Sequence, residues 1–401
     1  MSKGTKRKKI KIFILLIVIM ITLITLAVET YAWFVGLSTV NTNSFNINVS
    51  SGGGLEISLD GEHWKSGDDA LTINSTSITA SSGSGDHAYA GNTNKWVGSA
   101  GLIPLSSAGY LDTSTGRLQF YEKSSLSSTA GGYRLVANQV DNSTSEGDGY
   151  VAFDLFIRNG TDNAYTNNNY ENSGAENVYL KKTSSATVNG SSNYGAANSV
   201  RVGFYLIAGM KASGATTSQI TSLSCNSANS RTVKKICSSS TSAQKIYWNI
   251  WEPNYNSHTA NAVNYFNQAC KKRDFSTGDY LPDSCTALTE TSSFDTYAVL
   301  DSIDASDNVD IYDGINGYAA NNNSVSNPMG KLLKYTSYKI NSSVQYQYNN
   351  QLFKLAGNSI TKVRVYIWLE GQDVDNYDII TKNSDLVINF GLTKDRYGLN
   401  E

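Results

Sequence analysis

Apolar and polar residues alternate along several short stretches of this chain, a period of two that is typical of strands with one buried face. In residues 44–49, Phe45, Ile47 and Val49 point to one side and asparagines to the other. A glycine triplet at residues 52–54 ends this stretch. We therefore predict a half-buried strand followed by a turn.

The clearest later example is residues 362–370, whose one face carries Val363, Val365, Ile367 and Leu369. Further strands are predicted at residues 55–59, 118–121, 150–158, 178–180, 200–207, 343–348, 352–355 and 385–390.

Among these, residues 150–158 are apolar on both faces, which favours a central strand. Residues 352–355 are expected to form a hairpin with residues 343–348. Residues 66–116 are rich in Ser, Gly and Thr and show only weak periodicity, and residues 260–266 alone have a helical pattern outside the N-terminal region. Strands without intervening helices predict an all-β, antiparallel β-sandwich rather than a parallel sheet.

The N-terminal region has a different pattern. Residues 12–28 form an apolar run, and the lysines and arginine before it make a cationic head. Because positive charge stays on the cytoplasmic side, everything after Phe34 is expected to be exported. Thr30 and Ala32 are small residues at the positions that a signal peptidase reads, so we predict cleavage between Ala32 and Trp33; a retained transmembrane helix is the alternative.

Composition agrees with a secreted or cell-surface protein. Charged residues make up 16% of the chain and the formal net charge is −2, so no basic surface is available for nucleic acid. The 25 tyrosines, with many Asn, Ser, Thr and Gly residues, give an uncharged polar surface that is typical of extracellular β proteins.

The four cysteines lie in one part of the chain. An even number of cysteines in an exported protein favours disulfides. The pairing Cys225–Cys237 with Cys270–Cys285 closes the shortest loops, with free thiols as the alternative. Their spacing does not fit a metal site built on C-x-x-C.

The cysteine-containing part also divides the chain. We predict a signal peptide or membrane helix over residues 1–32 and the first part of the sandwich over residues 33–208. A loop-rich, disulfide-stapled insertion over residues 209–335 follows, then closing strands over 336–395 and a tail over 396–401.

Histidine usage argues against a zinc peptidase. The three histidines are His63, His87 and His258, and none lies in an H-E-x-x-H motif. A zinc site built from Glu252, His258 and a remote ligand is the enzymatic alternative, and a structural turn is the favoured interpretation of that stretch.

One oxygen-rich run has the spacing of a calcium loop, in Asp304, Ser306, Asn308 and Asp310. The sixth position of this run is Val309 rather than glycine, so a solvated acidic loop is the default interpretation. The aspartates at 373, 375 and 378 form a similar but less complete run. No cofactor is expected other than calcium at the first of these runs.

The residues Thr30-Tyr31-Ala32-Trp33-Phe34, followed by Asn43-Ser44-Phe45, resemble the TasA/camelysin group of exported Firmicutes proteins. The resemblance is specific over roughly residues 10–60. Residues 150–158, 200–204, 251–254 and 367–371 more loosely resemble large clostridial relatives with this type of signal.

The resemblance implies a jelly-roll-like sandwich, cleavage by a dedicated signal peptidase, and assembly into biofilm matrix fibres. In such fibres a freed N-terminal segment completes the sheet of the next subunit, which here makes Phe45, Ile47 and Val49 the candidate donor strand. Pairing of this strand within its own molecule is the alternative, and the two are compatible if the strand swaps. A camelysin-like metallopeptidase is a more remote implication.

The expected function is therefore structural, with other copies of the chain or related subunits as partners. The second hypothesis is a surface adhesin that binds glycan or a host protein through exposed Tyr and Trp side chains.

Overall fold

The computed structural model describes residues 45–67, 69–79, 88–97, 101–111, 115–129, 132–160, 175–189, 195–225, 233–235, 248–254, 257–269, 288–292, 297–299, 309–310, 332–334, 339–341, 351–371, 373–376 and 385–394. Within these ranges, no helix has both the length and the apolar character needed to cross a membrane. The predicted leader and its cleavage-site residues Thr30, Ala32 and Trp33 lie outside the described residues.

One six-stranded sheet carries the first and last strands of the described chain. Its order is β18 (Gln351–Leu355), β9 (Glu176–Leu180), β20 (Asp385–Thr393), β1 (Phe45–Ser51) and β4 (Leu71–Ile73), with β10 (Ser185–Asn189) also paired to β20.

The second sheet has twelve strands. Its main path is β15 (Val309–Asp310), β7 (Gly132–Gln139), β6 (Leu118–Thr129), β5 (Pro104–Leu111), β19 (Ser359–Glu370), β11 (Val200–Lys211), β13 (Trp248–Glu252) and β17 (Lys339–Asn341). Off this path lie β8 (Val151–Asn159), β2 (Leu55–Ser58), β3 (Lys65–Ser66) and β12 (Val233–Lys235).

The remaining elements are short. β14 (Tyr297–Val299) pairs with β16 (Leu332–Lys334), and the described helices are α2 (Ser75–Thr79), α3 (Thr217–Thr221) and α4 (Ala260–Ala269). Thr259 begins α4, because its hydroxyl accepts a hydrogen bond from the Ala262 amide at 3.3 Å. The predicted helix over residues 260–266 is confirmed.

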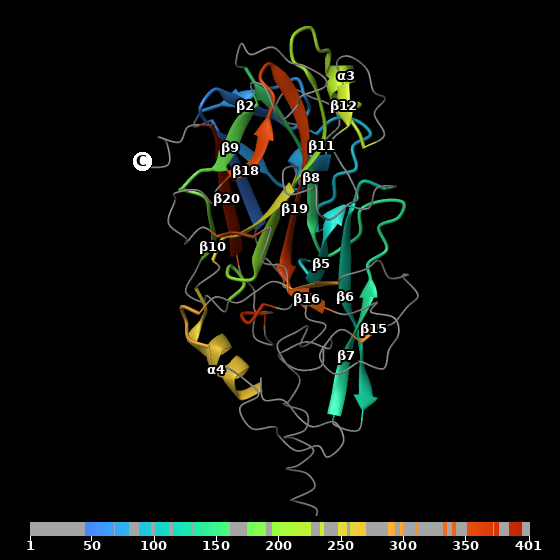
Figure 1. Ribbon diagram of the computed structural model, residues 1–401, viewed down its shortest axis with the longest axis vertical. Helices are drawn as coiled ribbons and strands as arrows, with labels where there is room; N and C mark the ends of the chain where they lie inside the picture. Colours follow the sequence, from blue (N-terminus) through green and yellow to red (C-terminus); the bar gives the residue numbers. More distant parts are fainter. Residues whose placement is uncertain are drawn as a thin grey trace, which may run out of the picture.

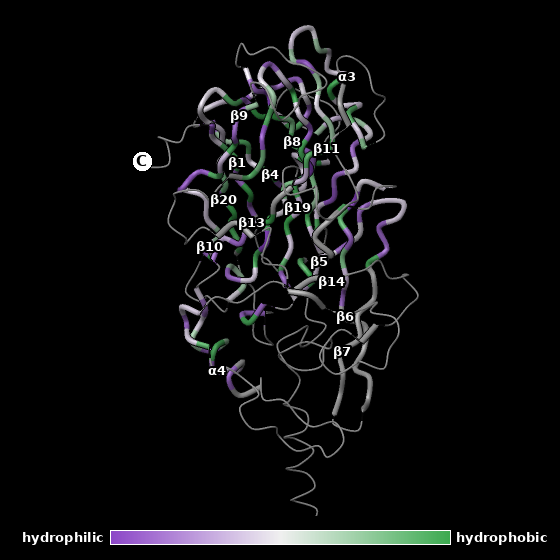
Figure 2. Tube along the Cα trace, viewed as in Figure 1, coloured by the Kyte–Doolittle hydropathy of each residue, from purple (hydrophilic) through white to green (hydrophobic). Residues whose placement is uncertain are grey.

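The two sheets pack face to face around one apolar core (Figure 1). Alternate residues of the facing strands meet there, as in the edge-on contact of the Phe204 and Phe390 rings, whose centroids are 5.2 Å apart. Hydrophobic positions lie mainly along the strands of the two sheets (Figure 2). The predicted apolar face of β19 is confirmed, since Val363, Val365, Ile367 and Leu369 all belong to this core.

The opposite face of the large sheet is also buried. Tyr366 and Trp368 of β19 pack there against Phe120 of β6, with ring centroids 5.9 and 5.4 Å apart. Strand β8 pairs with β19 on one side and β2 on the other, so the prediction that residues 150–158 form a central strand is confirmed. The β6–β7 ribbon extends away from the sandwich at the lower right of Figure 1.

The all-β prediction is confirmed, but the purely antiparallel arrangement is wrong. Strand β1 runs parallel to β20, β13 parallel to β17, and β19 parallel to β5. Alternation of side chains defines the buried face of a strand but is the same in both directions, which is why it did not reveal these pairings. The jelly-roll topology remains a prediction.

The weakly periodic residues 66–116 contain β4, α2 and β5, three elements that the pattern did not predict. Strand β4 has only three residues, of which Leu71 and Ile73 are fully buried, so it offers too short a period to be recognised. Residues 343–348, the other half of the predicted hairpin, lie outside the described residues, and β18 pairs with β9.

Candidate functional site

Strand β1 occupies the space between β20 and β4. It pairs in parallel with β20 from Phe45 opposite Leu386 to Ser51 opposite Leu392, and antiparallel with β4 over Ile47 to Val49. The central position means that both backbone edges of β1 have strand partners, so its removal would expose the edge of β20.

The two faces of β1 have different roles. Ile47 and Val49 are 0% exposed and lie in the core between the sheets. On the other face, the Asn48 side-chain amide donates to Asn389 Oδ1 at 2.8 Å, and the Thr72 hydroxyl donates to Asn48 Oδ1 at 3.2 Å. Burial of the apolar side stabilises the folded state. The side-chain hydrogen bonds on the polar side favour the observed register of β1 against its neighbours.

A glycine turn joins β1 to the rest of the molecule. Gly53 and Gly54 have φ angles of 63° and 77°, and the Leu55 amide donates to the Gly52 carbonyl at 3.2 Å. Positive φ at both central residues favours glycine, which explains the triplet in the sequence. This turn takes the chain from the small sheet into β2 of the large sheet.

The candidate donor residues are thus used within the molecule. Ile47 and Val49 fill the core of their own sandwich, and Phe45 is the first residue of the strand. Sequence reasoning identified this strand but not its partner. The partner, β20, has the same alternation, yet nothing in either pattern indicates that the first and last strands pair.

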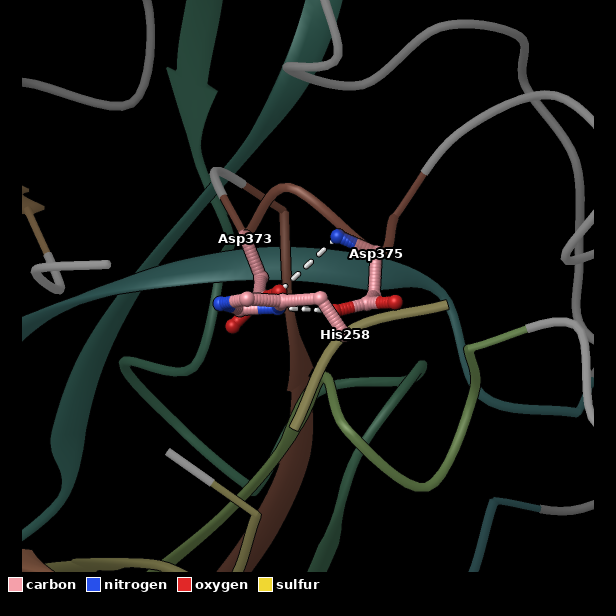
Figure 3. Close-up of side chains that lie close together, drawn as sticks. All are labelled: His258, Asp373 and Asp375. Atoms are coloured by element: carbon pink, nitrogen blue, oxygen red, sulfur yellow. Dashed lines mark hydrogen bonds and ion pairs between the residues drawn. The ribbon is translucent and has the colours of Figure 1, made fainter. Parts of the chain in front are cut away.

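A second group of chemical interest lies near the end of β19 (Figure 3). His258, Asp373 and Asp375 are buried, and one ligand atom from each falls within 4.8 Å of the others. His258 Nδ1 contacts Asp375 Oδ2, and its Nε2 lies 2.7 Å from the Ser292 carbonyl oxygen. A carbonyl can only accept a hydrogen bond, so Nε2 carries a proton.

These contacts favour an imidazolium rather than a metal ligand. Burial disfavours the charged ring, but the hydrogen bond to Asp375 and the carboxylates of Asp373 and Asp375 outweigh it and raise the pKa of His258. Asp373 is in turn paired with Arg201, whose Nη2 lies 2.5 Å from Asp373 Oδ2. Asp375 therefore pairs with His258, while Asp373 shares the Arg201 guanidinium with Glu252.

The alternative zinc site built on Glu252 and His258 is not among the groups of possible metal ligands in the described residues. Glu252 lies 3.1 Å from Arg201 Nε, and the group within reach of a shared ion consists of His258, Asp373 and Asp375 in the described part of the chain. The cluster instead ties the start of α4 to the end of β19, because the Thr259 amide donates to Asp375 Oδ1 at 2.9 Å. We interpret it as structural.

No protein-family model, curated protein or solved structure matches this chain. The resemblance to the TasA/camelysin group therefore stays a prediction from the residues around the leader.

A third group of polar residues stabilises the face of the large sheet that points away from the small sheet. Arg364 holds Asp154 through two hydrogen bonds of 2.7 and 3.1 Å, and the hydroxyls of Tyr150 and Tyr366 each donate to Glu146 at 2.7 Å. Burial raises the pKa of Glu146 against the opposing effect of Arg364.

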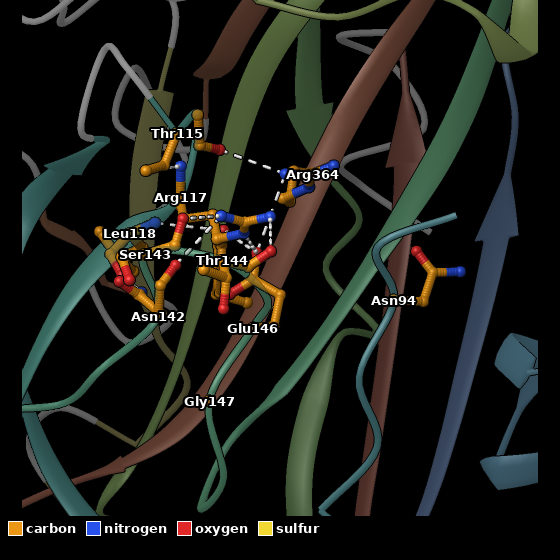
Figure 4. A network of polar contacts seen from close by, with 12 residues as sticks. Asn94, Thr115, Arg117, Leu118, Asn142, Ser143, Thr144, Glu146, Gly147 and Arg364 are labelled. Atoms are coloured by element: carbon orange, nitrogen blue, oxygen red, sulfur yellow. Dashed lines mark hydrogen bonds and ion pairs between the residues drawn. The ribbon is translucent and has the colours of Figure 1, made fainter. Parts of the chain in front are cut away.

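Around this group, the Arg117 guanidinium lies against a loop (Figure 4). It donates to the carbonyls of Asn142, Ser143 and Thr144 at 3.1, 2.9 and 3.0 Å. Every charged group here faces a fixed partner, which is typical of a structural network rather than of a site awaiting substrate.

The remaining predicted site residues are placed as follows. Cys225 is buried and disulfide-bonded, while Cys237, Cys270 and Cys285 lie outside the described residues, so the connectivity stays a prediction. Of the calcium candidates, Asp310 belongs to β15, and Asp304, Ser306 and Asn308 lie outside the described residues. Among the described aromatic side chains, Trp251, Trp368, Tyr150, Tyr205 and Tyr366 are buried and unavailable for stacking on a glycan.

Proposed function

We propose that this chain is a structural subunit of an extracellular or cell-surface assembly, in which copies are joined by exchange of β1. One observation supports the proposal above the others. The strand that completes the small sheet is the first described element, and a glycine turn is its covalent link to β2. Such a strand can leave its own sheet and enter that of a neighbour when the turn extends.

The energetics of exchange follow from the contacts of β1. Burial of Ile47 and Val49 contributes roughly 1.5–3 kcal/mol each, and this contribution is the same whether the strand comes from the same chain or another. The balance between closed and exchanged forms then depends on the turn, on the entropy of association and on concentration. Cleavage of the leader after Ala32 would free the N-terminal end of β1 to move.

Electron microscopy of the purified mature protein tests the proposal. We expect filaments from the wild type and monomers from a variant that lacks residues 33–49. A sharper variant is Asn48→Cys with Asn389→Cys, because these residues are register partners whose side chains already meet. A disulfide formed within one chain locks β1 in place and should abolish filaments until a reductant is added.

The matched control is Thr187→Cys with Val387→Cys, which ties β10 to the same strand β20 without holding β1. This control should form filaments with and without reductant. Wild-type protein that stays monomeric at all concentrations, or filaments that persist in the locked variant, would contradict strand exchange.

A further inference from the structure

Three residues at the ends of three strands meet beside the turn that follows β1. Lys394 follows β20, Asn159 ends β8 and Glu176 begins β9. Lys394 Nζ lies 2.8 Å from Asn159 Oδ1 and 3.0 Å from Glu176 Oε2. The Asn159 side-chain amide donates to the same Glu176 oxygen at 2.8 Å. An amine, a carboxamide and a carboxylate thus touch one another in a closed triangle.

The surroundings hold this triangle in place. Asn159 is 0% exposed, and the Lys394 side chain is 8% exposed. Asn159 Nδ2 also donates to the Ala356 carbonyl at 3.1 Å, so two acceptors fix the plane of the amide. A Cβ at Gly54 would lie 3.8 Å from Lys394 Nζ, an ordinary contact distance, which places the turn directly beside the lysine.

We propose that Lys394 and Asn159 form an intramolecular isopeptide bond, with Glu176 as the general base and general acid. The geometry contains each part that the reaction needs: a nucleophilic amine against an amide carbonyl, and a carboxylate in contact with both nitrogens. The Glu176 side chain is 31% exposed, so one member of the triangle borders solvent.

The reaction balances without any other reagent. The Lys394 ammonium passes one proton to the Glu176 carboxylate, and the neutral amine attacks Asn159 Cγ. Glu176 then protonates Nδ2 and takes a second proton from Nζ. The tetrahedral intermediate collapses as the carbonyl re-forms and the Cγ–Nδ2 bond breaks, with its electron pair leaving on ammonia.

Ammonia takes up the proton held by Glu176 and departs as ammonium, which returns the carboxylate to its starting state. The products are one amide bond between Cγ and Nζ and one ammonium ion. The protein therefore becomes lighter by one ammonia.

A second buried lysine, Lys362, also contacts a side-chain oxygen but lacks the partners that the reaction needs. Lys362 Nζ lies 3.3 Å from Asp154 Oδ2, but Arg364 binds both oxygens of that carboxylate. Arg364 and Lys362 outweigh the effect of burial and hold the pKa of Asp154 well below its usual range, so this carboxyl is an anion and a poor electrophile. Asn159 is uncharged, and its carboxylate partner is a separate residue.

Mass spectrometry of the intact, denatured and reduced protein tests the proposal directly. We expect the wild type to be lighter than its sequence by one ammonia, and a branched peptide to join the segments that contain residues 159 and 394. Glu176→Gln and Lys394→Arg should both have the full mass of their sequences. Asn159→Asp should lose water instead of ammonia, because the leaving group changes.

Lys182→Arg replaces an exposed lysine in the same part of the chain and should keep the loss of ammonia. Circular dichroism establishes that each variant is folded before its mass is interpreted, and the branched peptide of the wild type decides the matter if a variant does not fold. Wild-type protein of full mass, without the branched peptide, would overturn the proposal. Retention of the ammonia loss in Glu176→Gln would overturn the role of the carboxylate.

Discussion

Strand β20 is held by its surroundings in two different ways. Along its length, β1 binds through backbone hydrogen bonds and two buried side chains, and all of these contacts are reversible. Just past its end, Lys394 reaches Asn159 of the opposite sheet, where the proposed isopeptide bond is permanent. The first contact joins neighbours within a sheet, and the second joins one sheet to the other.

The two contacts distinguish the strand that can be exchanged, β1, from the strand that must keep its position, β20. A strand that is exchanged between copies needs a receiving strand that keeps its place while the groove is empty. Strand β20 is that receiver, and a covalent bond from its end to β8 would hold it against the large sheet. The glycine turn beside Lys394 belongs to the mobile side of this boundary, since it links β1 to β2.

The largest effect is expected from removal of the covalent contact. The proposed bond closes a loop with a sequence separation of 235 residues, so its loss should lower the free energy of unfolding by on the order of 5 kcal/mol. Lys394→Arg and Glu176→Gln should show this loss in denaturant unfolding, and Lys182→Arg should not. Equal stability of all three variants and the wild type would show that this contact is only an ion pair.

The second largest effect on stability is expected from the reversible contact between β1 and the core. Ile47→Ala should lower the free energy of unfolding by about 2–5 kcal/mol, because it leaves a cavity in the core between the sheets. Asn46→Ala changes the adjacent, exposed position and should stay within about 0.5 kcal/mol of the wild type. If the two substitutions have similar effects in denaturant unfolding, β1 does not occupy its groove in solution.

A substitution in the glycine turn after β1 is expected to have a smaller effect on stability but a specific effect on assembly. Gly53→Ala should destabilise the closed turn by about 1–2 kcal/mol, because its φ of 63° is unfavourable for alanine, and thereby shift the protein toward exchanged oligomers. Gly67 has a φ of 67° with no atom within 4 Å of an added Cβ, so Gly67→Ala is a matched control. Light scattering should show larger oligomers for the first variant alone.

The smallest predicted effect is the pH dependence of the His258 ion pair. Its pKa is raised in the folded state, so its contribution to stability is complete below the ordinary value of about 6.5 and is lost as the pH rises through the raised value. His258→Gln should flatten this decline in the free energy of unfolding. His63→Gln, at a half-exposed histidine beside Asp60, should leave most of it. A decline that is unchanged in His258→Gln would contradict the imidazolium.

The faces of individual strands could be predicted from the sequence, and their partners could not. Alternation alone identified the buried residues of β1 and β19, since burial of one face is a local property. The contacts that define the sites are not local: His258 and Asp375 are 117 positions apart, and Asn159 and Lys394 are 235 apart. Each of these residues is ordinary in its own segment, and only the packing of the two sheets brings them together.

Strand exchange is the central claim, and a mixture of two single-cysteine variants tests it most directly. Asn48→Cys and Asn389→Cys are purified separately, mixed and oxidised, so that the two introduced cysteines can meet only across two chains. The account predicts a cross-linked peptide with residue 48 of one chain and residue 389 of the other. A mixture of Thr187→Cys and Val387→Cys should give none, and absence of the cross-link from the first mixture as well would contradict exchange.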